Sequence, residues 1–194
     1  IPCLIILIIL MAGAVWQIGD IVVEYIAERR KHKCDVPQLL RDVHTAGADG
    51  LAELIENSGL LRRQKKALLE LAESRGLPKD TLTALAERLL ATEEARNART
   101  TSITDMIAKL GPMFGLLGTL IPLGPGIVAL GQGDTVTLSE SMNVAFDTTI
   151  AGVIAAAVAS VISHIRKRWY NDDMVSLETL MEAVLEEVTA DVEG

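Results

Sequence analysis

Three long apolar blocks constrain what this chain can fold into more than any other feature of its sequence. They span Leu4–Val23, Ala108–Leu130 and Met142–Ile165, and each is close to the about 20 residues that a helix needs to cross a bilayer. The chain carries a net charge of -8, yet 49% of its 194 residues are hydrophobic, which is unusual for an acidic water-soluble domain. We therefore expect an all-α integral membrane protein with three transmembrane helices.

The segments around these blocks set the expected domain organisation. We expect transmembrane helix 1 at 1–23, a helical cytoplasmic domain at 24–107, transmembrane helix 2 at 108–131, an external link at 132–141, transmembrane helix 3 at 142–165 and a cytoplasmic C-terminal helix at 166–194. The first block lacks the basic leader of a cleaved signal peptide. We expect it to remain as a membrane anchor.

Lys and Arg predict the orientation of the chain in the membrane. Basic residues follow the first block at 29–33, precede the second block and follow the third at 166–168, whereas the link between the second and third blocks has none. Because positively charged flanks stay in the cytoplasm, we expect an external N-terminus and a cytoplasmic C-terminus. The protein would then be a multi-pass protein of the cell membrane.

The polar segment between the first two blocks has the pattern of successive helices. Asp35 can cap a helix with Pro37 in its first turn, Ser58 stands ahead of a second amphipathic helix, and Gly76 ends that helix. We expect a third helix to begin at Pro78 and to continue into the second apolar block. The basic run in "LLRRQKKALL" is more typical of one solvated helix face than of a lipid or nucleic-acid patch, so no nucleic-acid partner is expected.

Small residues form one face of each of the two later blocks. Helical spacing aligns Ala145, Thr149, Gly152, Ala156, Ser160 and Ser163 in the third block and Ala108, Pro112, Gly115, Thr119, Pro122 and Gly126 in the second. The opposite face of the third block carries Phe146, Ile150, Val153, Ile154, Val158, Val161 and Ile162, which suit lipid. The small faces suit either close helix packing or a narrow cavity, and for the threonines spacing leaves both alternatives open.

Two features of these blocks go against an ordinary membrane helix. Asp147 is a carboxylate inside the third block, where a charge costs about 2.5 to 3.5 kcal/mol unless it is protonated, paired or hydrated. It either reaches the water outside or has a function. The prolines near the end of the second block predict a kink or unwinding at Pro122–Gly126.

The two later blocks resemble a known family. "GPMFGLLGT" at 111–119 and "FDTTIAGVIAAAVASVI" at 146–162 are similar to the second and third crossings of the MotA/TolQ/ExbB proton-channel family, most of all to ExbB and TolQ. The resemblance covers the segment Ala108–Arg168. It implies a homopentamer around a central pore that holds a dimer of an ExbD/TolR-like single-span protein. Proton flow through such a complex drives work by the partner, as in biopolymer transport and envelope energisation.

The resemblance also implies which residues line the pore. Thr119 and Thr149 match the family threonines that face the lumen, and we add Thr148 and Asp147 as candidates for the proton pathway. The candidate small residues of the packing or pore-facing side are Gly115, Gly152, Ala156 and Ser160. Val144 stands where ExbB-like chains have a glutamate, and Asp147 and Glu140 are the nearest carboxylates that could replace it.

Two other classes of function compete with a proton-driven motor. A passive membrane scaffold would use the same small faces for packing alone. A membrane enzyme is disfavoured, because the sequence shows no nucleophile–base set, no metal-ligand set and no phosphate-binding loop. We expect no cofactor and no metal.

Overall fold

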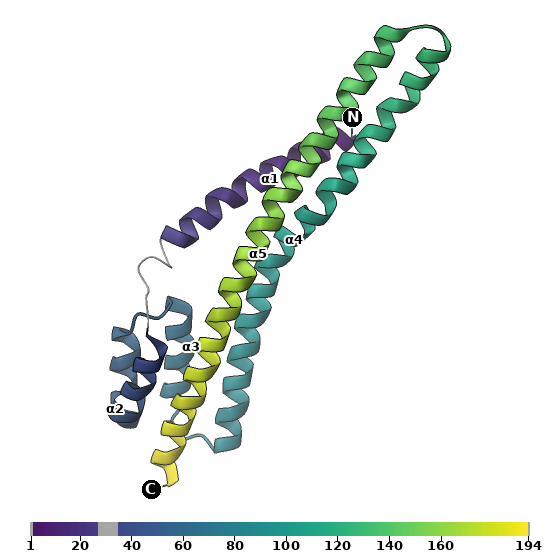
Figure 1. Ribbon diagram of the computed structural model, residues 1–194. Helices are drawn as coiled ribbons and strands as arrows, with labels where there is room; N and C mark the ends of the chain where they lie inside the picture. Colours follow the sequence, from purple (N-terminus) through teal and green to yellow (C-terminus); the bar gives the residue numbers. More distant parts are fainter. Residues whose placement is uncertain (1, 27–34, 194) are drawn as a thin grey trace. The chain divides into compact units, whose positions relative to one another are not determined.

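The computed structural model describes residues 2–26 and 35–193 (Figure 1). Its helices are α1 (Pro2–Glu24), α2 (Val36–Asn57), α3 (Arg62–Glu73), α4 (Lys79–Gly131) and α5 (Thr135–Glu193). The all-α prediction is confirmed for this part of the chain. The basic run at 29–33, which helped to predict the orientation, lies outside the described residues.

The chain divides into two compact units. The membrane unit comprises residues 1–22 and 99–167, and the polar unit comprises residues 23–98 and 168–194. Both α4 and α5 contribute to each unit, because α4 is one uninterrupted helix of 53 residues and α5 is one of 59 residues. The expected continuity of the helix after Pro78 with the second apolar block is therefore confirmed.

The prolines of α4 do not unwind it. Pro112, Pro122 and Pro125 all lie inside the helix, and the unwinding expected at Pro122–Gly126 is not found. A proline removes one backbone hydrogen bond and leaves those of its neighbours in place, and helices in membranes tolerate that loss when other groups satisfy the freed carbonyl.

In the membrane unit, α1 packs on both α4 and α5. The buried contact between the three helices includes Leu10 of α1, Ile107 of α4 and Ala159 of α5. Ile162, expected to face lipid, is instead 5% exposed, because it lies one turn beyond Ala159 on the part of α5 that its neighbours cover. The three helices are long and apolar enough to cross a membrane.

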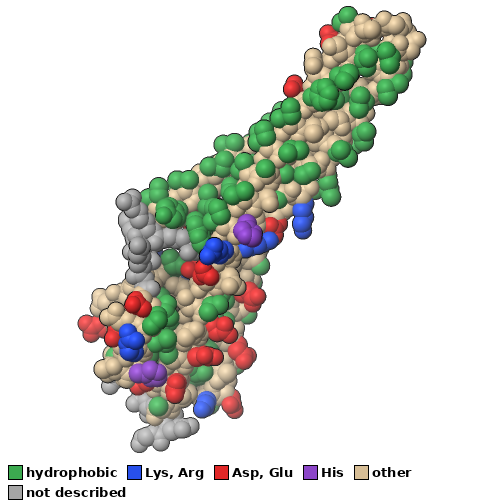
Figure 2. Space-filling model, in the orientation of Figure 1, with side chains coloured by type: hydrophobic (Ala, Val, Ile, Leu, Met, Phe, Trp, Pro, Cys, Tyr) green, Lys and Arg blue, Asp and Glu red, His purple; other side chains and the backbone are tan. Residues whose placement is uncertain are grey.

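The outer surface of the membrane unit is apolar. Its large hydrophobic side chains include Trp16, which is 79% exposed, and Leu116, which is 63% exposed. In Figure 2, hydrophobic side chains are spread along the visible face of this unit, among tan backbone and other side chains. A surface of this kind requires lipid or another apolar partner.

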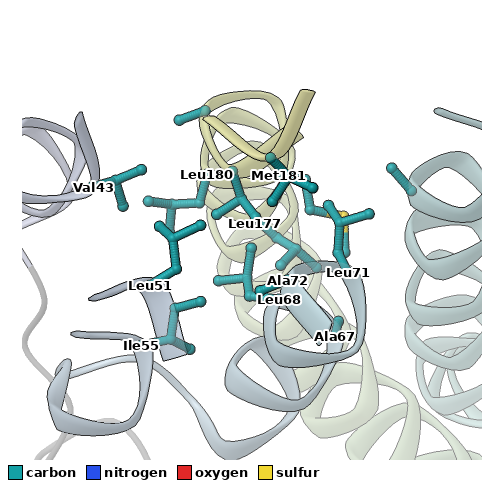
Figure 3. Close-up of a cluster of buried hydrophobic side chains, with 14 of the residues drawn as sticks. Val43, Leu51, Ile55, Ala67, Leu68, Leu71, Ala72, Leu177, Leu180 and Met181 are labelled. Atoms are coloured by element: carbon teal, nitrogen blue, oxygen red, sulfur yellow. The ribbon is translucent and has the colours of Figure 1, made fainter. Parts of the chain in front are cut away.

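The polar unit has its own hydrophobic core, to which α2, α3, α4 and α5 all contribute (Figure 3). Leu51 and Leu71 are 0% exposed, and Leu177 of α5 is 2% exposed. Gln64 joins two of these helices, because its amide accepts from the Leu61 N–H at 3.2 Å and donates to the Asp173 carbonyl at 3.0 Å.

One helix boundary in the polar unit differs from the prediction. Ser58 does not begin α3, because its hydroxyl donates to the Ile55 carbonyl at 2.6 Å and so closes α2. The next helix starts only at Arg62. Gly76 does follow α3, with a φ of 92° that suits glycine better than any other residue.

Candidate functional site

The small faces of α4 and α5 meet in the membrane unit. A Cβ atom on Gly152 would lie 2.6 Å from the Gly111 carbonyl oxygen and 2.8 Å from Gly115 Cα. A Cβ on Gly111 would lie 2.7 Å from the Gly152 carbonyl oxygen. The two backbones are therefore in direct contact, and only glycine allows this approach.

The small face of α5 continues beyond this contact. Ala156 is 7% exposed and lies against Gly111, at 3.0 Å from the position that a Cβ on Gly111 would take. Ser160, one turn further, is exposed. Of the four predicted small residues, the protomer itself therefore covers Gly115, Gly152 and Ala156 and leaves Ser160 open.

The three predicted threonines have different surroundings. Thr148 is 4% exposed and fills the space beside Gly118, where a Cβ added to Gly118 would lie 2.8 Å from Thr148 Cβ. The Thr148 hydroxyl donates to carbonyls of its own helix. Thr149 is half-buried and reaches across to the Gly115 carbonyl at 3.5 Å, the long limit of a hydrogen bond. Thr119 is half-buried and donates to the Leu116 carbonyl at 2.6 Å.

Asp147 lies on a different side of α5. It lines a groove of about 390 Å³ together with Thr148 and Ala151 of α5 and a row of apolar side chains of α1, namely Leu4, Leu7, Ile8, Met11, Ala12 and Val15. Side chains two residues apart on a helix are rotated by about 200° from each other. Asp147 and Thr149 therefore point in nearly opposite directions.

The structure pairs basic residues that predicted the orientation with two carboxylates that the sequence analysis did not single out, Asp20 and Asp105. All Lys and Arg of the membrane unit, namely Arg99, Lys109, Arg166 and Lys167, lie at one end of it, which we call the basic end. Arg166 is 3% exposed and contacts Asp20 of α1 at 2.6 Å, whereas Lys167 contacts Asp105 of α4 at 2.6 Å.

Asp105 makes a second contact at the basic end, with the hydroxyl of Ser163. It precedes the span expected at 108–131. Hydrogen bonds from Lys167 and then from Ser163 hold the pKa of its carboxyl below the usual value of 3.8, against the opposing effect of burial. A sequence signal existed, since Asp105 continues the small face of α4 one turn before Ala108.

At the opposite end, Asp134 caps α5. Its carboxylate accepts from the Val136 N–H at 3.2 Å, the Thr137 N–H at 3.1 Å and the Thr137 hydroxyl at 2.5 Å. The bonds from Thr137 lower the pKa of Asp134. The helix therefore begins at Thr135, within the segment 132–141 expected as the external link.

Comparison with known proteins identifies the family to which the chain belongs. The model of the MotA/TolQ/ExbB proton channel family matches residues 53–179, which is more than half of the chain and includes the α4–α5 contact. No curated protein matches the chain. The match, together with the three apolar helices, shows that the chain is a membrane-embedded member of the MotA/TolQ/ExbB proton channel family.

Proposed function

We propose that this chain is the pore-forming subunit of a motor driven by the proton-motive force, similar to ExbB and TolQ. Five copies would surround a pore formed by α4 and α5. A dimer of an ExbD/TolR-like single-span protein would stand in that pore and convert proton flow into work on the cell envelope. The basic end of the membrane unit and the polar unit would face the cytoplasm.

The observation that carries this proposal is that the hydroxyl-bearing side chains of Thr119 and Thr149 are only partly buried within one copy of the chain. Both side chains are half-buried at the edge of the α4–α5 contact, so the protomer does not enclose them. The Thr119 hydroxyl donates to its own helix and keeps lone pairs that can accept a hydrogen bond. Such a hydroxyl can solvate a protonated carboxyl of the partner or a water molecule in a pore that is otherwise apolar.

The energetics of the proposed coupling are favourable. A proton that moves through 100 mV releases about 2.3 kcal/mol, which is enough to bias one conformational step. Threonine does not titrate near neutral pH, so the proton carrier would be a carboxyl group on the partner. In this scheme the threonines solvate the carrier and do not replace it.

The test uses Thr119→Val and Thr149→Val, which remove a hydroxyl while keeping the shape of the side chain. The tagged chain is purified with whatever subunits accompany it and reconstituted into vesicles, and proton flux is measured after a pH jump. We expect both variants to lose flux and to keep the oligomeric mass of the wild type. Thr92→Val is the control, because Thr92 is an exposed threonine of the polar unit that donates to the Arg88 carbonyl in the same way.

The competing scaffold function makes the opposite prediction. If the small faces serve packing alone, Thr119→Val and Thr149→Val are silent in every proton-driven activity. A chain that remains monomeric and copurifies with no single-span protein carrying an intramembrane acid would also refute the motor. Mass measurement of the native complex gives both the number of copies and the partner ratio.

A further inference from the structure

Two residues at the basic end of the membrane unit, Asp105 and Ser163, lie on the same helix faces as Thr119 and Thr149. Asp105 precedes Thr119 on α4, and Ser163 follows Thr149 on α5. The two residues of each pair are separated by about four helical turns, or about 21 Å, and point to within about 40° of the same direction. The aligned faces of α4 and α5 therefore form one strip along the helices. Thr119 and Thr149 lie near one end of this strip, and Asp105 and Ser163 lie at its basic end.

Direct contacts show that this strip is continuous across the two helices. Gly115 faces Thr149 and Gly152, and Gly111 faces Gly152 and Ala156. Further along, the Ser163 hydroxyl bonds to the Asp105 carboxylate. Ser160, exposed and one turn before Ser163, adds a hydroxyl between the two ends of the strip.

We propose that the Asp105 carboxylate receives the transported proton at the basic end of this strip and releases it to water. This inference rests on the proposed function, because it assigns the point at which protons leave the α4–α5 face. Asp105 would take the proton from a water at the end of the strip and give it to a water of the cytoplasm. The carboxylate returns to its charged form and no other bond changes.

The surroundings of Asp105 suit a group that releases protons. Its side chain is 31% exposed and the Lys167 side chain is 54% exposed, so water reaches both from the basic end. Lys167 donates to Asp105 at 2.6 Å, and Lys109 is the other charge that acts on the carboxyl. The ammonium groups favour the ionised carboxylate, and a bound proton therefore leaves readily.

The neighbouring ion pair provides a control within the same structure. Arg166 precedes Lys167 on α5 but pairs with Asp20 of α1, at 2.6 Å. Both pairs join two helices at the basic end, yet only the Asp105 pair lies on the strip with the threonines. If ion pairs at this level serve stability alone, loss of the Asp20 carboxylate should reduce flux at least as much as loss of the Asp105 carboxylate, because Arg166 is 3% exposed and Lys167 is 54% exposed.

The experiment compares Asp105→Asn, Asp105→Glu and Asp20→Asn in the reconstituted complex used for the threonine variants. We expect Asp105→Asn to reduce proton flux by about tenfold or more, the loss expected for one interaction with a charged group. Asp105→Glu should restore most of it, and Asp20→Asn should keep the flux of the wild type. Oligomeric mass and partner content are measured for every preparation.

Three results would overturn the inference. Wild-type flux in Asp105→Asn would show that the carboxylate is dispensable, and equal losses in Asp105→Asn and Asp20→Asn would assign both to stability. Ser163→Ala removes one hydrogen bond to Asp105 and keeps the ion pair with Lys167. If Asp105→Asn loses assembly while Ser163→Ala keeps the flux of the wild type, the role of Asp105 is structural. Loss of flux in the threonine variants alone would sink this inference and leave the proposed function standing.

Discussion

Replacing Gly152 by alanine should weaken the contact between α4 and α5 more than any other single methyl group added in the membrane unit. The new Cβ would lie 2.6 Å from the Gly111 carbonyl oxygen, 2.8 Å from Gly115 Cα and 3.1 Å from Gly115 N. All three atoms belong to the backbone, so no side chain can rotate to make room. The helices themselves must move apart.

The size of the effect follows from that movement. A Cβ and a carbonyl oxygen need about 3.3 Å, so the helices must separate locally by about 0.7 Å, and a gap of 0.5 to 1 Å removes a quarter to a half of the dispersion attraction between the facing atoms. Overpacking of a close contact typically costs about 1 to 3 kcal/mol. We expect Gly152→Ala to reduce the free energy of unfolding by an amount in this range.

The measurement is reversible unfolding of the full chain in mixed micelles, followed by far-UV circular dichroism. Gly19→Ala is the matched control, because Gly19 is an exposed helical glycine of α1 with nothing within 4 Å of an added Cβ. Its substitution should be neutral or slightly stabilising, since alanine has the better helix propensity. A Gly152→Ala protein as stable as the Gly19→Ala protein would refute the view that backbone contact holds the two helices together.

Three further predictions address other parts of the molecule. Leu71→Ala should destabilise the polar unit by about 2 to 5 kcal/mol, because Leu71 is 0% exposed; Leu77→Ala, at a position 39% exposed, should change thermal stability little. Thr104→Val should be neutral or stabilising by up to about 1 kcal/mol, because the hydroxyl is buried and has no hydrogen-bond partner among the described residues; a loss of stability in the same unfolding assay would contradict this. The folded-state pKa of Asp105 lies below its ordinary value of 3.8, so its ion pair stabilises the fold fully above that value and the stabilisation is lost as pH falls through the lowered pKa. For a partly exposed pair we expect no more than about 1 kcal/mol, seen as a fall in thermal midpoint below pH 4 that is smaller in Asp105→Asn.

The sequence predicted the elements that depend on periodic patterns and on membrane thickness. Three blocks of near-bilayer length predicted the apolar helices, and the absence of Pro and Gly between Thr92 and Leu110 predicted that α4 continues from one unit into the other. The small faces predicted either close helix packing or a narrow cavity, and at Gly111, Gly115 and Gly152 the structure shows close packing of α4 on α5. These inferences succeed because each rests on many residues that all favour the same structure.

Features set by one residue were harder to predict. Ser58 is a good capping residue at either end of a loop, and the sequence alone did not show that its hydroxyl closes α2. The prolines of α4 predicted unwinding because each removes a backbone hydrogen bond, yet the remaining bonds keep the helix intact. Asp20 and Asp105 were not singled out, because their roles depend on partners far along the chain, Arg166 and Lys167.

The contacts of α5 with both α1 and α4 explain why adjacent residues of α5 have different roles. Each step along a helix turns the side chain by about 100°, so Arg166 meets α1 while Lys167 meets α4. The same rule separates two candidates of the third apolar block: Asp147 lines the groove with α1, and Thr149 reaches toward Gly115 of α4. If Thr149 lines a pore, Asp147 points away from it. Its carboxylate then lies in the groove beside α1, outside the lumen that the threonines would share.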